Sequence, residues 1–101
     1  FDEPIEITLK IKSPKDPDNP TKRIRVDYTF LYDWFGNTFK YVETEKQEPF
    51  DDIVKVKCSP YAMVNWALQY SDRVEVIEPI DVRKAVVEKI RNLNKKYDVY
   101  L

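Results

Sequence analysis

The sequence predicts an α+β fold, in which helices cover an antiparallel β-sheet. Several short segments alternate between apolar and polar residues, which is the pattern of half-buried strands. Two other segments begin with helix-start signals and carry apolar residues at helical spacing. The chain has 101 residues, 43% of them hydrophobic, which suits one domain with one core. We therefore expect a single domain over residues 1–101.

Four segments are predicted to be strands. In residues 4–12, isoleucine and leucine side chains alternate with polar ones, so that one face of the strand is apolar. Residues 38–44, 51–58 and 72–78 alternate in the same way, and the first two of these are expected to form a hairpin with a long loop. Residues 13–20 contain three prolines and three Asp or Asn residues, so this segment is predicted to be a loop.

Two helices are predicted from their start signals. Ser59 and Pro60 mark the first, because a serine side chain caps free amide groups and proline suits the first helical turn. Residues 60–70 contain few polar side chains, so we expect this helix to be largely buried, with Trp66 in the core. The second helix is predicted to run from Pro79 to Tyr97, with its apolar residues spaced by four, four, three and four.

Residues 21–35 fit two different structures. Their apolar side chains alternate as in a strand, but they also match a helical stripe that ends at Gly36. The pattern alone leaves both structures open.

The composition argues against catalysis, so a non-enzymatic protein is predicted. The chain has no histidine, one cysteine and one glycine. It therefore lacks the commonest general base and metal ligand, a thiolate cluster and a glycine-rich phosphate loop. We expect no cofactor and no metal, and a small acylphosphatase-like hydrolase is disfavoured because its anion loop needs several backbone donors. The lone Cys58 is expected to be a small buried residue and is consistent with a reducing compartment.

The charge and hydropathy give no sign of a membrane or of a general attraction to nucleic acid. The formal net charge is −1 at pH 7. A nearly neutral chain has no long-range pull towards polyanions. There is no run of about 18 apolar residues, so no membrane partner and no membrane span are expected.

Residues 66–86, WALQYSDRVEVIEPIDVRKAV, carry the most informative motif. A helix ends in Trp-x-Leu-x-Tyr, a strand reads Val-Glu-Val-Ile-Glu-Pro, and Arg83 is the fourth residue past Pro79. This stretch resembles the C-terminal extension that follows the WYL domain in bacterial transcription regulators. Ser71 stands where that family usually has glycine, so the turn there is expected to differ. The resemblance also includes the first strand and the aromatic segment that ends at Phe35-Gly36.

The resemblance decides the ambiguous segment in favour of a helix over residues 21–35. The order of elements is then strand, helix, strand, strand, helix, strand, with one further helix. This order predicts a ferredoxin-like βαββαβ sandwich with a four-stranded antiparallel sheet and an extra C-terminal helix. In that topology the first and third strands are central.

The resemblance also implies a function. The chain would be a non-catalytic regulatory domain of a WYL-type transcription regulator, and it would contribute to dimerisation and to relay of a ligand signal. The whole protein would be a cytoplasmic homodimer that binds DNA through a winged helix and senses a nucleotide or nucleic-acid effector through its WYL domain. Because the chain begins at Phe1 rather than Met, we expect it to be a fragment that those two domains precede.

One candidate site lies on the outer face of the predicted sheet. Its cations are on the two central strands, with Lys40 and Arg73 at the flanks. They could bind a nucleotide or another anionic ligand, and the alternative function is a stand-alone ferredoxin-like module of that kind. The plainer interpretation is a solvated face, because Glu6 and Glu75 are interspersed among the cations. The candidate residues are Lys10, Lys12, Lys55 and Lys57.

Arg83 is a further candidate ligand residue at the start of the last helix. It could contact an anionic ligand or another domain, because its guanidinium fits carboxylates and phosphates. We favour a structural ion pair with Glu78 or another nearby carboxylate.

A second candidate site is the last helix. The two helices of the sandwich already cover one face of the sheet, and the charged outer face offers little apolar surface to a third. We therefore predict that this helix contributes to a dimer or interdomain interface. The candidate interface residues are Val82, Val86, Ile90 and Leu93 on one flank and Val87 near the other.

Overall fold

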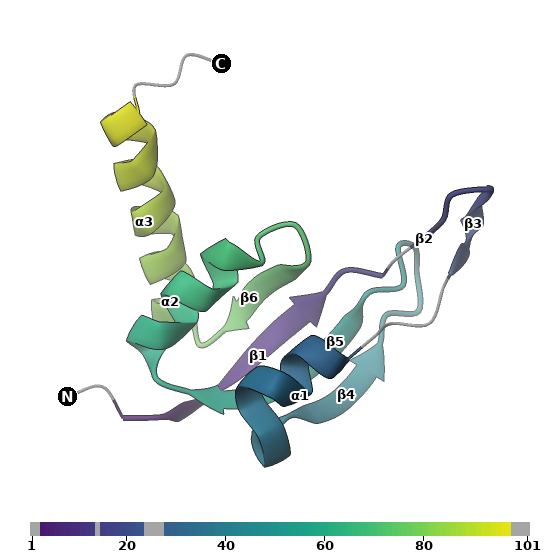
Figure 1. The fold of residues 1–101 in the computed structure, drawn as a ribbon, viewed down its shortest axis with the longest axis horizontal. Coiled ribbons are helices and arrows are strands. Elements are labelled where there is room, and N and C mark those ends of the chain that lie inside the picture. Colours follow the sequence, from purple (N-terminus) through teal and green to yellow (C-terminus); the bar gives the residue numbers. More distant parts are fainter. Residues whose placement is uncertain (1–2, 14, 24–27, 98–101) are drawn as a thin grey trace.

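The computed structural model describes residues 3–13, 15–23 and 28–97. The chain folds into a four-stranded main sheet, a two-stranded hairpin and helices, which confirms the predicted α+β class (Figure 1). The strands are β1 (Ile5–Ile11), β2 (Lys15–Asp16), β3 (Asn19–Arg23), β4 (Lys40–Thr44), β5 (Asp52–Cys58) and β6 (Val74–Glu78). The helices are α1 (Thr29–Phe35), the short 3₁₀ helix η1 (Gly36–Thr38), α2 (Pro60–Gln69) and α3 (Ile80–Tyr97).

The main sheet confirms the predicted topology. Its four strands lie in the order β4-β5-β1-β6, and every neighbouring pair is antiparallel. With α1 and α2 as the crossovers, this is the strand order of a ferredoxin-like βαββαβ sandwich, and α3 is the additional C-terminal helix. The two central strands, β1 and β5, pair Ile7 with Val56 and Leu9 with Val54, so their apolar residues lie side by side on one face.

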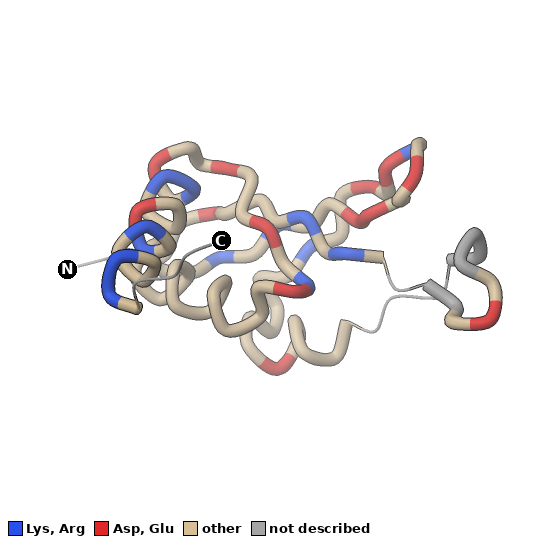
Figure 2. The backbone as a smooth tube through the Cα atoms, turned by 90° about the horizontal axis from the view of Figure 1, so that it is seen from above, with Lys and Arg blue, Asp and Glu red and all other residues tan. Residues whose placement is uncertain are grey.

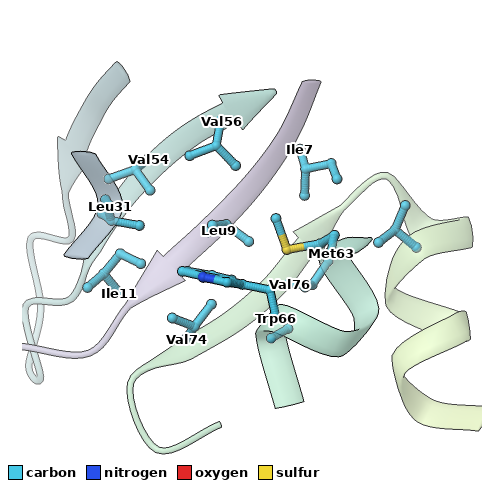
Figure 3. Close-up of a cluster of buried hydrophobic side chains, with 12 residues drawn as sticks. Ile7, Leu9, Ile11, Leu31, Val54, Val56, Met63, Trp66, Val74 and Val76 are labelled. Atoms are coloured by element: carbon cyan, nitrogen blue, oxygen red, sulfur yellow. The ribbon is translucent and has the colours of Figure 1, made fainter. Parts of the chain in front are cut away.

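This face forms the core beneath α1 and α2 (Figure 3). Leu31 of α1 and Met63 of α2 are fully buried against it. Trp66 is 5% exposed, which confirms that it is a core residue, and its ring stacks on that of Phe30 at a centroid distance of 6.0 Å. The strand residues of the core are Ile7, Leu9, Ile11, Val54, Val56, Val74 and Val76.

Local signals explain where α1 and α2 begin and end. The Ser59 hydroxyl oxygen accepts a hydrogen bond from the amide of Ala62 at 3.2 Å, and Pro60 occupies the first turn of α2. Gly36 ends α1 with φ +52°, a conformation that glycine adopts without a steric penalty. Both the Ser59-Pro60 helix start and the glycine stop were therefore readable in the sequence.

The prediction for residues 15–23 was wrong. Residues 15–20 of the predicted loop, together with the first residues of the predicted helix 21–35, form a separate hairpin of β2 and β3. Asp16 pairs with Asn19, so Pro17 and Asp18 form its two-residue turn. Proline and aspartate signal a turn, but they do not reveal whether the flanking residues pair with each other. Helix α1 occupies only Thr29–Phe35 of the predicted range, and residues 24–27 lie outside the described ones.

Two expectations about burial also need correction. Helix α2 is not largely buried, because only Met63, Trp66 and Ala67 are in the core. Tyr61, near its start, is 75% exposed. Cys58 is half-buried at the end of β5 rather than fully enclosed. The sequence shows which side chains are apolar, but the number of neighbouring elements decides how many faces of a helix are covered.

Candidate functional site

Helix α3 is attached to the domain by its first turns. Val82 is 3% exposed and belongs to the core, and Val86 packs against it partly buried. Arg83 Nη1 donates to Glu75 Oε2 at 2.8 Å and to the Val76 carbonyl at 2.7 Å. Strand β6 is at the edge of the sheet, so the guanidinium gives the Val76 carbonyl a hydrogen-bond donor on this edge strand. Arg83 therefore ties α3 to β6, as the structural interpretation of this residue requires, through Glu75 rather than Glu78.

The C-terminal half of α3 extends away from the sheet and from α2 (Figure 1). Of the candidate interface residues, Val82 is enclosed in its own core, whereas Val87, Ile90 and Leu93 are exposed. Tyr97 continues their stripe and is 68% exposed. We call Val86, Ile90, Leu93 and Tyr97 the α3 seam.

An apolar groove lies beside the α3 seam, between α2, α3 and the beginning of β1. Its volume is about 450 Å³. Tyr61 and Val64 line it on the α2 side, and Ile5 lies at its β1 end. The α3 side is lined by Asp81, Val82, Ala85 and Lys89, so one carboxylate and one lysine face it. This groove was not predicted from the sequence, because the apolar residues of α2 were expected to lie in the core. The readable signal was that residues 60–70 carry more apolar side chains than one buried face can hold.

The cations of the outer sheet face do not form a free basic patch. Lys10 Nζ lies 3.1 Å from Glu45 Oε2, and Lys55 Nζ lies 3.6 Å from Glu6 Oε1. The hydrogen bond to the Glu45 carboxylate raises the pKa of Lys10 above its ordinary value. Lys55 does face Lys40 across β4 and β5, as expected when Val54 and Val56 point inward. Lys10 and Lys55 therefore each have a carboxylate beside them on the outer face of the sheet.

Lys10 and Lys12 are neighbours in a second, more polar groove of about 380 Å³. Arg73 also lines it, with its guanidinium carbon 3.8 Å from the centre of the Phe30 ring. The acidic residues Asp51, Asp72 and Glu75 line the same groove. Lys57 is exposed on β5, opposite Glu6. Lys10, Lys12 and Arg73 therefore share this groove with three carboxylates, so it is not an uncompensated cation site.

Two buried carboxylates, Asp51 and Asp52, lie where the loop after β4 enters β5. Neither was singled out from the sequence. Asp52 accepts hydrogen bonds from the hydroxyls of Tyr28 and Thr44, the latter at 2.7 Å. Asp51 accepts one from the Ser13 amide at 2.8 Å. Ser13 follows β1, Tyr28 precedes α1 and Thr44 ends β4, so these contacts fasten the start of β5 to its neighbours and give both carboxylates a structural role.

Within the described ranges, no three or more His, Cys, Asp and Glu side chains gather where they could hold a metal ion. No helix in those ranges is long and apolar enough to cross a bilayer. No protein-family model, curated protein or solved structure matches the chain.

Proposed function

We propose that the chain is a non-catalytic regulatory domain, the C-terminal extension of a WYL-type transcription regulator. In this proposal it contributes to dimerisation and to signal relay, and α3 supplies the contact to another domain or subunit. The whole protein would be a cytoplasmic homodimer that binds DNA through a preceding winged helix, with a nucleotide or nucleic acid as effector.

The exposed α3 seam carries this proposal. Helix α3 continues well beyond the point where its own domain can cover it, and its apolar stripe continues with it. Ile90 is 50% exposed and Leu93 is 37% exposed. Contiguous apolar surface of this kind is typical of contact sites. The motif in residues 66–86, which spans α2, β6 and the start of α3, supplies the resemblance to the regulator family.

The alternative, a stand-alone module that binds an anionic ligand, has less support. It needs several uncompensated cations at one place. Instead, Lys10, Lys55 and Arg83 each pair with a glutamate.

The test is the assembly state of the intact protein that contains this chain, measured by light scattering. Ile90→Glu places a charge in the α3 seam and is expected to weaken the dimer or to release the domain from its neighbour. Asn92→Glu is the matched control, because it adds the same charge at an exposed position two residues away, on the other side of the helix.

Both variants should keep the fold of the isolated chain, as judged by circular dichroism. An Ile90→Glu protein that retains the assembly and effector response of the wild type would contradict the proposed role of α3.

A further inference from the structure

The spacing of the α3 seam is that of a helix–helix contact. Val86, Ile90, Leu93 and Tyr97 follow one another at intervals of four, three and four residues. In a seven-residue repeat written abcdefg, this places Val86 and Leu93 at d and Ile90 and Tyr97 at a. Such a two-in-seven seam faces one partner helix, whereas a helix lying in a bilayer surface presents a broader apolar face.

The same repeat places lysine at each position that precedes an a residue. These flanking g positions are Lys89 and Lys96, and the opposite flank carries Val87 and Asn94 at the e positions. Among the described residues, neither lysine has a carboxylate within ion-pair distance. Lys89 also lines the groove against α2, so it stands at the junction of groove and seam. Basic residues recur along α3 (Figure 2).

A second copy of α3 would not place a carboxylate opposite Lys89 or Lys96. In an antiparallel pair, equal flanks meet, so Lys89 and Lys96 would face the same two lysines of the other copy. In a parallel pair, g faces e, and Lys89 would meet Asn94. Neither arrangement brings a carboxylate to either lysine, and the antiparallel one adds repulsion.

We propose that the α3 seam and the adjoining groove bind an acidic amphipathic helix, with Glu or Asp at the positions that face Lys89 and Lys96. This inference rests on the proposed role of α3 as a contact to another domain or subunit, and it defines the chemistry of that partner. The apolar side of the partner helix lies on Ile90 and Leu93, and the groove beside α2 receives its other edge. Charge at the flanking positions then selects the partner, because these positions set pairing preference in helix–helix contacts.

The test uses two synthetic amphipathic peptides and the 101-residue chain. Both peptides carry the same apolar residues at a and d, but one has glutamate and the other lysine at e and g. Binding is measured by fluorescence anisotropy at low salt. Exchanging two attractive contacts for two repulsive ones corresponds to about tenfold in affinity, in favour of the acidic peptide. This preference should shrink as salt is added.

The double variant Lys89→Glu/Lys96→Glu provides the decisive control. It leaves the seam intact and should prefer the basic peptide by a similar factor. Ile90→Glu should weaken binding of both peptides. Equal affinity for the two peptides, or no binding of either, would overturn the proposal. So would stronger association with phosphatidylserine vesicles than with the acidic peptide, since the surface would then be a lipid contact.

These outcomes differ from a failure of the proposed function. If Ile90→Glu disrupts the intact assembly while the chain does not distinguish the two peptides, α3 is a contact surface but its partner is not acidic. If Ile90→Glu leaves the intact assembly unchanged, the role of α3 in that assembly is wrong whatever the peptides show.

Discussion

Helices α2 and α3 both carry apolar residues at helical spacing, yet they relate to the domain in different ways. Helix α2 lies across the sheet, and Met63, Trp66 and Ala67 are buried there. Helix α3 buries Val82 fully and Val86 in part, and it then leaves the sheet with the rest of its stripe uncovered. Apolar periodicity therefore identifies the face of a helix that needs a partner, but it does not show whether the same domain supplies that partner.

The largest difference between the two helices should appear at Trp66. We expect Trp66→Ala to lower the free energy of unfolding by about 3–5 kcal/mol, because it removes the largest core side chain of α2 and leaves a cavity. The measurement is a chemical denaturation curve, with Gln69→Ala as an exposed control on the same helix. An unchanged denaturation midpoint would show that burial of Trp66 does not stabilise the packing of α2 on the sheet.

A second comparison uses one substitution at two positions of α3. Val82→Ala removes buried methyl groups, so a loss of about 1–2.5 kcal/mol in unfolding free energy is expected. Val87→Ala removes the same atoms from an exposed position and should change it by less than about 0.5 kcal/mol. If the two variants are equally stable, the two halves of α3 do not differ in burial as described.

The attachment of α3 to β6 can be tested at Arg83. Arg83→Met keeps the unbranched stem of the side chain but removes the guanidinium and with it the hydrogen bonds to Glu75 and to the Val76 carbonyl. We expect a loss of about 0.5–1.5 kcal/mol, because both groups remain near water and can be partly resolvated. Lys84→Met serves as the exposed control. Faster amide hydrogen exchange in the first turns of α3 should accompany the loss, and its absence would place the attachment elsewhere.

The smallest effect on stability is expected at Ile90. In the isolated chain, Ile90→Ala should change the unfolding free energy by no more than about 0.5 kcal/mol, because the side chain is already exposed. A loss as large as that of Val82→Ala would mean that Ile90 is buried within its own domain. The α3 seam would then not be a free surface.

Much of the fold could be predicted from the sequence. The alternation in β1, β5 and β6, the Ser59-Pro60 start of α2 and the spacing in α3 are local signals, each produced by the geometry of one element. The hairpin of β2 and β3 was not predicted, because its turn residues also fit an unpaired loop. The ion pair of Lys10 was not predicted either, since its partner Glu45 lies beyond the end of β4. Glu6, the partner of Lys55, was expected among these lysines.

The sequence by itself determined the four strands of the main sheet, helices α2 and α3, and the identity of the apolar stripe on α3. Only the tertiary structure decided that this stripe is buried at Val82, partly buried at Val86 and exposed at Ile90, Leu93 and Tyr97. It also decided that the first turn of α3 meets β6 through Arg83 and that a groove opens beside Tyr61. The physical reason is that periodicity follows from the helix alone, whereas burial depends on where the neighbouring elements end.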